Sequence, residues 1–178
     1  MKQSLKTSID KNKEFQSIVK ELISNKTVQE MKKYRQHYNT SCFEHCYVAA
    51  YYCYSICKKY HLDYISATRA AMLHDLFLYD WRVRQPDRKG LHAFTHGKTA
   101  CDNACKLFDL NEKEKDIIIK HMWPVTISFP KSMEGFILTF VDKYCAISES
   151  FDVLKSKIFR KRILRYTYLL LSLIIIKL

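Results

Sequence analysis

The chain has 178 residues, of which 48% are hydrophobic, and its formal net charge is +12 at pH 7. This length favours one domain with a sizeable buried core. Because only three Gly and three Pro residues interrupt the apolar positions, the composition argues against turn-rich sandwiches and barrels and predicts an all-α bundle with short loops.

The seven Cys residues do not indicate a disulfide framework, since their number is odd and the polar N-terminus lacks the apolar core of a secretion signal. We therefore expect a cytoplasmic protein. A zinc site that uses Cys42 and Cys46 is an alternative, although the usual pair of Cys with two residues between them is absent. The basic charge fits nucleotides, nucleic acid or acidic membranes as partners, and it fits a solubilising surface equally well.

The N-terminal region predicts helices that pack on a later core. Residues 1–13 are polar, and we expect them to fray. Residues 14–24 carry apolar side chains on one helical face, and residues 27–34 predict a second helix capped by Thr27. We assign residues 1–40 to this region, and residues 41–150 to the main domain.

Two long helices are expected next, over residues 41–60 and 64–76. His45 lies at the edge of the apolar stripe of the first helix, and the second helix ends in His74 and Asp75, inside an apolar run. A buried carboxylate is costly unless it is paired or binds a metal, and imidazole and carboxylate are both metal ligands. For this dipeptide alone, a core His paired with its neighbouring Asp is the simpler explanation.

The longest polar connection, residues 79–93, contains several guanidinium groups, including Arg82 and Arg84. These groups either bind phosphate or lie in a solvated surface loop. A helix is expected over residues 94–108, with His96 in its first turn.

Two further helices are expected, over residues 111–121 and 132–149. The first begins at Asn111, a good cap, and closes at His121. The second contains an apolar run that leads directly into Asp142, so this carboxylate has apolar neighbours on both sides.

Residues 151–178 form a basic and then apolar C-terminal helix or tail. Its apolar stretch, residues 166–176, is too short to cross a bilayer, which takes about 20 residues, so we expect no transmembrane segment. A helix packed on the bundle is the simpler expectation, and attachment to a membrane surface is the alternative.

Six polar residues lie on the expected helices, most of them at the edge of or within apolar surface. In chain order they are His45, His74, Asp75, His96, His121 and Asp142. This order resembles the HD-domain metal-dependent phosphohydrolases, whose signature is a His, a His-Asp pair and a distant Asp, all from helices of one bundle. The pairs His96-Gly97 and Lys120-His121 resemble the two-metal branch, in particular the bacterial symmetrical diadenosine-tetraphosphate hydrolases. The resemblance covers residues 41–149.

The resemblance implies an HD-domain-like helical bundle with a metal site in its core. One divalent ion would be held by His45, His74, Asp75 and Asp142. A second would be held by His96 and His121, with Asp75 bridging the pair. Imidazole and carboxylate ligands suit Fe, Mn, Zn or Co.

The implied activity is hydrolysis of a nucleotide or a related phosphate ester or anhydride through a metal-bound hydroxide. His74 and Asp75 would lie at the catalytic centre. Many two-metal members carry a Lys shortly after the His-Asp pair, where this chain has Leu76-Phe77-Leu78. Phosphate contacts are therefore expected from Lys98, Arg82 or Arg84.

Two other readings of the same residues stay open. One is a catalytically weak or inactive HD-fold module that binds a nucleotide or nucleic acid, although no helix shows the basic face that a specific nucleic-acid partner requires. The other is a one-metal nucleotidase that uses only His45, His74, Asp75 and Asp142.

Overall fold

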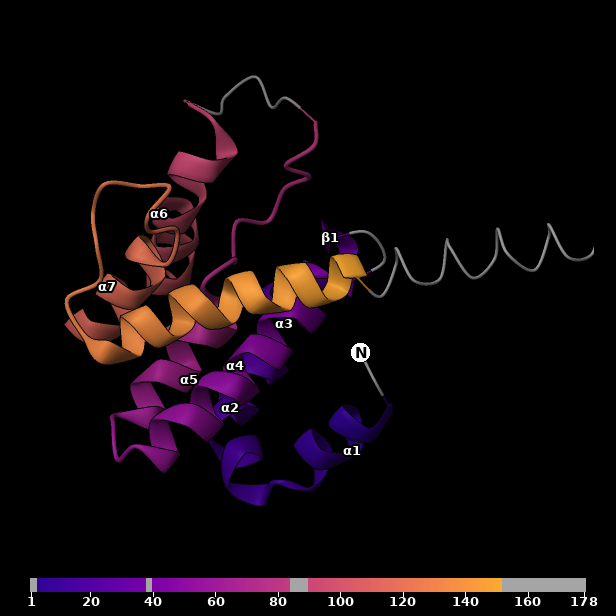
Figure 1. The fold of residues 1–178 in the computed structure, drawn as a ribbon. Helices are drawn as coiled ribbons and strands as arrows, with labels where there is room; N and C mark the ends of the chain where they lie inside the picture. Colours follow the sequence, from indigo (N-terminus) through magenta and orange to yellow (C-terminus); the bar gives the residue numbers. More distant parts are fainter. Residues whose placement is uncertain (1–2, 38–39, 84–89, 152–178) are drawn as a thin grey trace, which may run out of the picture.

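The computed structural model describes residues 3–37, 40–83 and 90–151, and helices dominate this part of the chain (Figure 1). This confirms the all-α fold class. None of the helices in these ranges combines the length and the apolar character needed to cross a membrane. The elements are α1 (Gln3–Lys11), α2 (Lys13–Ser24), α3 (Lys26–Gln29), the 3-10 helix η1 (Glu30–Lys33), β1 (Arg35–His37), β2 (Thr40–Ser41), α4 (Cys42–Lys59), α5 (Tyr64–Leu73), α6 (His92–Cys105) and α7 (Glu112–Lys120). A further helix, orange in Figure 1, runs over residues 133–151.

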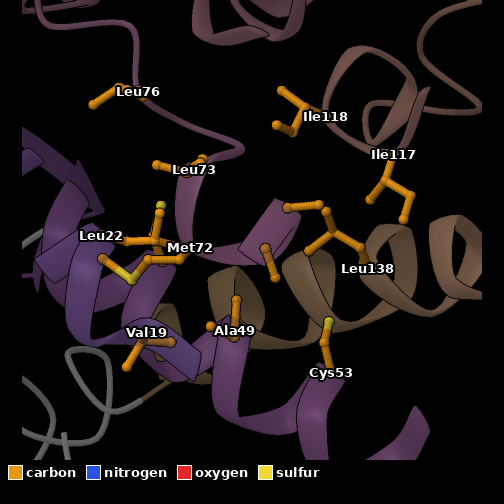
Figure 2. Packing of buried hydrophobic residues seen from close by; sticks show 14 of the residues in the cluster. Val19, Leu22, Ala49, Cys53, Met72, Leu73, Leu76, Ile117, Ile118 and Leu138 are labelled. Atoms are coloured by element: carbon orange, nitrogen blue, oxygen red, sulfur yellow. The ribbon is translucent and has the colours of Figure 1, made fainter. Parts of the chain in front are cut away.

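The core lies where α4 and α5 cross. Both helices present small buried side chains to each other, among them Ala49 and Cys53 on α4 and Ala67 and Ala71 on α5, so their backbones approach closely. Figure 2 shows that side chains from α2, α7 and the 133–151 helix meet in the same cluster. Burying each Leu or Ile side chain of this cluster contributes about 1.5–3 kcal/mol.

The N-terminal region is more ordered than its polar sequence predicts. We expected residues 1–13 to fray, but α1 forms and Ile9 is fully buried in the core. The side chain of Asn12 then caps α2 by accepting a hydrogen bond from the amide of Phe15. The ring of Phe15 packs edge-on against Tyr47 and Tyr54 of α4. These contacts pack the N-terminal helices on the core.

Local capping decides where α4 and α7 begin. Ser41 forms a capping box with Glu44, and Asn111 forms one with Glu114, so both helices start close to the predicted residues. The predicted Thr27 cap is wrong, because the side chain of Asn25 accepts from the amide of Thr27 and starts the helix one residue earlier.

Helix α5 ends earlier than predicted, at Leu73 instead of residue 76. The Nδ1 atom of His74 lies 2.7 Å from the carbonyl oxygen of Ala71, which in a longer helix would accept from the amide of Asp75. The imidazole takes that carbonyl, so His74 and Asp75 lie in the turn that follows the helix.

Ion pairs fix α7 against its neighbours. Arg69 of α5 donates to the buried carboxylate of Glu114 at 2.7 Å. Lys113 of α7 lies 3.1 Å from Asp63, at the start of α5, and 3.4 Å from Glu134 on the 133–151 helix. These contacts set the position of α7, whose C-terminal end carries His121.

Candidate metal centre

The structure brings together all six residues of the predicted cluster. They fall into two groups that share Asp75, and the ligand atoms within each group lie within 4.8 Å of one another. Five helices supply them: α4, α6, the 133–151 helix, and the C-terminal ends of α5 and α7. Each of the six is at most 9% exposed. The groups are His45, His74, Asp75 and Asp142, and Asp75, His96 and His121.

The carboxylate of Asp75 faces both groups. Its Oδ1 atom lies 3.3 Å from Nε2 of His96 and 3.7 Å from Nε2 of His121. Its Oδ2 atom lies 3.4 Å from Nε2 of His74. On the other side, Nε2 of His74 lies 3.6 Å from Oδ1 of Asp142. Asp75 therefore stands in the position of a carboxylate shared by two neighbouring sites.

Backbone carbonyls fix which ring nitrogens face the centre. The Nδ1 atoms of His74, His96 and His121 each lie 2.7 Å from a carbonyl oxygen three or four residues earlier in the chain. A carbonyl only accepts, so in each ring Nδ1 carries a proton and Nε2 is the nitrogen that faces inward. The Nε2 atoms of His96 and His121 are 2.9 Å apart. Two lone pairs that face each other at this distance require a cation between them, either a proton or a metal ion.

Two carboxylates hold the ring of His45. Its Nδ1 atom donates to Oε1 of Glu149 at 3.1 Å, and its Nε2 atom lies 2.9 Å from Oδ1 of Asp142. A carboxylate on the outer nitrogen is the usual way in which a metal-binding imidazole is oriented. Glu149 lies seven residues after Asp142, two helical turns on, so helix periodicity is a signal that could have found it.

Several buried atoms of the cluster are left without hydrogen-bond partners in the described part of the chain. They are Nε2 of His74, Oδ1 of Asp75 and Oε1 of Gln36. The amide of Gln36 donates to Oδ2 of Asp75 at 2.5 Å, and this residue of β1 was not anticipated, since nothing in its sequence context marks it. Orphaned buried polar atoms are costly, and the donor types present here fit a divalent metal ion.

Burial and mutual charge shift the pKa values within the cluster. Burial alone lowers the pKa of His45, but hydrogen bonds to Asp142 and Glu149 raise it well above its usual value. Burial acts to raise the pKa of Asp75, yet the surrounding imidazoles hold it well below its usual range. Burial, together with the charges of the neighbouring imidazoles, lowers the pKa of His121 to about 3. Ionised carboxylates thus lie among imidazoles, an arrangement that attracts a cation.

The close approach of α6 and α7 depends on Gly97. A Cβ atom at this position would lie 2.9 Å from the carbonyl oxygen of Ile119 and 3.4 Å from the ring of His121. A side chain here would push the end of α7 away from α6. The His96-Gly97 pair therefore has a physical role, because the Gly allows His121 to reach His96.

A cavity of about 300 Å³ lies against the cluster. Lys143 is the one lysine or arginine among the described residues that line it, and its Nζ donates to the carbonyl oxygens of His121 and Thr139. Burial lowers the pKa of Lys143. The lining residues are Gln36, Asp75, Trp81, His92, Ala93, His96, His121, Met122, Val125, Asp142, Lys143 and Ala146.

The structure does not bring Lys98 or Arg82, two of the three predicted phosphate-binding cations, to this cavity. Lys98 points to solvent, where it pairs with Asp102 at 3.0 Å, one helical turn away. Arg82 pairs with Asp80 at 2.6 Å on the surface. Arg84 lies outside the described residues. Lys143, to which the sequence analysis gave no role, lines the cavity instead.

His92, which we expected in the loop, is the first residue of α6. Its ring stacks on that of His96, with centroids 4.4 Å apart, and on the indole of Trp81, with centroids 5.6 Å apart. The rings of His92 and Trp81 thus continue the wall of the cavity beyond His96.

The thiols of Cys42 and Cys46 lie behind the cluster and also fall within 4.8 Å of an Asp75 oxygen. Cys42 donates to the carbonyl oxygen of Asp75 at 3.1 Å, and the sulfur of Cys46 lies 3.6 Å from Nδ1 of His74. Burial raises the pKa of both thiols, which disfavours the thiolate form that zinc binds. This pair is therefore better explained as packing that supports His74 and Asp75.

Neither a family model, nor a curated protein, nor a solved structure matches the chain. A functional assignment therefore depends on the residues and geometry of the site itself.

Proposed function

We propose that the chain is an HD-type metal-dependent phosphohydrolase that acts on a nucleotide or a related phosphate ester or anhydride. One observation carries the proposal: two groups of buried imidazole and carboxylate ligands share the single carboxylate of Asp75. A core His paired with an Asp, the simpler explanation of the dipeptide, does not require four further ligand-type residues around the same carboxylate.

In this proposal His45, His74, Asp75 and Asp142 hold one divalent ion, and Asp75, His96 and His121 hold a second. The bound ions, of the class Fe, Mn, Zn or Co, would lower the pKa of a water molecule and neutralise phosphoryl oxygens. The residues around the ligands prepare the site for this role. Glu149 orients His45, Gln36 orients Asp75, and backbone carbonyls bind the Nδ1 atoms so that the Nε2 atoms face the site.

The cavity favours a substrate with one phosphoryl group at the cluster and an apolar or aromatic remainder. We expect Lys143, which lines the cavity together with Asp142, to bind a phosphoryl oxygen. The remaining wall, including Trp81, Met122 and Val125, is largely apolar and suits a planar base or another hydrophobic group. A cavity of about 300 Å³ is at the small end of ligand sites, which favours a mononucleotide-sized molecule.

A hydrolysis assay tests the proposal directly. Purified protein is incubated with Mn, Co or Fe and a panel of nucleoside monophosphates, dinucleoside polyphosphates and simple phosphate esters. We expect phosphate or nucleotide release from wild type, and a loss of at least about 100-fold in His74→Asn. His61→Asn is the matched control, because His61 is exposed and its backbone φ of 56° is one that Asn tolerates. Equal release from wild type and His74→Asn would refute catalysis at this site.

A second comparison identifies the cation that binds phosphate. Lys143→Gln removes the charge at the cavity, and we expect its KM to rise about tenfold. Lys98→Gln makes the same change on the surface, two residues after His96, and should leave KM unchanged. A KM that rises in Lys98→Gln but not in Lys143→Gln would indicate that Lys98 binds the phosphate, and it would contradict the proposed role of Lys143.

A further inference from the structure

The helix over residues 133–151 has a solvent face that lacks the charged residues usual on a surface helix. Five of its large apolar side chains are between 56% and 63% exposed: Met133, Phe140, Tyr144, Ile147 and Phe151. Together with the partly buried Ile137 they form what we call the outer apolar face. Figure 1 shows this orange helix along the outside of the bundle, and a contiguous apolar surface of this kind marks an interaction site.

The spacing of the outer apolar face is a heptad repeat. Its members follow one another at alternating intervals of four and three residues from 133 to 151, and the sequence continues the alternation with Leu154 and Ile158. Alternating four and three is the pattern of helices that pack side by side in a coiled coil. Packing against a core or covering a lipid surface requires an apolar face but not this strict alternation.

The opposite side of the same helix is already occupied. Leu138, Val141 and Cys145 are buried against the bundle, and Asp142 belongs to the metal cluster. The outer apolar face is therefore additional to the surface that holds the helix in the fold.

We propose that two copies of this chain associate through their outer apolar faces, with the 133–151 helices packed side by side. In a symmetric pair the same surface of both copies meets, so that surface must be complementary to itself. A face of aromatic and aliphatic side chains is self-complementary without charge pairing. The association does not depend on the metal cluster and stands or falls separately from the proposed activity.

The chain's own residues 152–178 are a poorer occupant. They follow directly on Phe151, so the chain would have to reverse its direction within them to cover the same helix. Residues 152–178 contain neither Gly nor Pro, the residues that favour tight reversals, and their first apolar positions continue the heptad spacing instead of interrupting it.

A membrane surface is also a poorer occupant. Helices that lie on anionic membranes flank their apolar face with Lys and Arg. Lys143 is the one basic residue in the sequence from 133 to 151, where there are three acidic residues, and it bonds inward to carbonyl oxygens.

Analytical ultracentrifugation of the full chain over a range of concentrations tests the proposal. We expect wild type to reach twice its chain mass of 21.2 kDa. The double substitution Phe140→Asp with Ile147→Asp should weaken association by at least about 100-fold, because it places charges in the centre of the contact. Both residues are exposed, so the fold should survive, and far-UV circular dichroism checks this. Ile127→Asp, at a residue that is 98% exposed and off the helix, is the matched control and should associate as wild type does.

Photo-crosslinking distinguishes the occupants. A benzophenone side chain in place of Phe140, in a mixture of ¹⁴N and ¹⁵N protein, should give mixed-isotope crosslinks to residues 133–151 of a second copy. Crosslinks within one chain to residues 152–178 would overturn the proposal, as would a wild type that stays monomeric at every concentration. It would also be overturned by a monomeric wild type that floats with phosphatidylserine vesicles while the double variant does not.

Discussion

At the scale of single residues, the same local hydrogen bond, from a His Nδ1 to a backbone carbonyl, occurs three times in the candidate metal centre. His74 and His121 stand at the ends of helices, where carbonyl groups lack helical partners, and each ring takes the carbonyl three residues back. His96 does the same with the carbonyl four residues back. Each tautomer is thus set by nearby backbone before any tertiary contact is made, and the metal-facing nitrogen follows from it.

Glu149→Gln tests the residue that orients His45. The amide keeps the size of the carboxylate but removes its charge, so the imidazole loses its ionic acceptor. We expect the affinity for Mn or Zn to fall by about 10- to 100-fold, measured by isothermal titration calorimetry. Glu112→Gln makes the same change at a side chain that is 91% exposed, and its affinity should equal that of wild type. Unchanged affinity in Glu149→Gln would mean that this contact does not tune the site.

Gly97→Ala tests the approach of α6 to α7. The added methyl group collides with the carbonyl oxygen of Ile119, so we expect a loss of about 1–3 kcal/mol in the free energy of unfolding. Metal affinity should fall as well, because His121 is displaced from His96. Urea titration and calorimetry measure the two effects. Asp102→Ala, at an exposed position of the same helix, controls for a change in helix propensity, and a Gly97→Ala protein with wild-type values for both would contradict the packing argument.

The sequence indicated the six cluster residues because most of them are polar side chains at the edge of or within apolar helical surface, and because their order resembles the HD-domain signature. It did not locate Gln36, whose role depends on where β1 meets Asp75 in space. It indicated Lys98 as a phosphate contact and gave Lys143 no role. Lys98 was indicated because it is close to His96 in the sequence. Its side chain nevertheless points to solvent from α6, and this direction depends on tertiary packing.

At the scale of elements, the starts of α4 and α7 were predictable and the end of α5 was not. Capping boxes mark the starts of α4 and α7. In each, the capping residue, Ser41 or Asn111, is followed three residues later by a Glu. The end of α5 carries no Gly or Pro, and the helix stops because the His74 ring competes for a backbone carbonyl. The β1–β2 hairpin was also missed, since its strands are too short to show a period.

Arg69→Ala tests the tie between α5 and α7. Removing the guanidinium leaves the carboxylate of Glu114 buried without its ionic partner, which should cost about 3 kcal/mol of unfolding free energy. Urea titration measures this. Lys115→Ala removes a surface partner of Glu112 on the same helix and should change stability by less than about 0.5 kcal/mol. A similar small effect in Arg69→Ala would show that the buried pair does not hold α7 in place.

At the scale of the whole molecule, the cluster couples metal binding to pH. Nearby carboxylates raise the pKa of His45, His74 and His96 against the opposing effect of burial. After removal of metal, these residues stabilise the fold below their unfolded pKa of about 6.5, and the contribution is lost as pH rises through their folded pKa. His121, with a pKa lowered to about 3, contributes with the opposite sign, and its contribution is lost as pH falls from about 6.5 to about 3.

A bound metal replaces the protons of the first three rings, so the increase in Tm on adding Mn should grow from about pH 6 to about pH 8. Differential scanning fluorimetry with and without Mn measures it, and the buffer should take up protons released on binding. His45→Asn should flatten the dependence, whereas His61→Asn should not. A Tm increase that shrinks as the pH rises would contradict the assignment of these imidazoles as ligands.

The number of ions bound per chain tests directly whether the cluster holds two metal ions. Metal-depleted protein is equilibrated with Mn, freed of excess ion and analysed for metal content, and electron paramagnetic resonance reports whether the ions are coupled. The shared Asp75 carboxylate predicts two coupled ions in wild type and one uncoupled ion in His96→Asn. A single ion in wild type that His96→Asn leaves in place would contradict the two-ion centre and favour a one-metal site at His45, His74, Asp75 and Asp142.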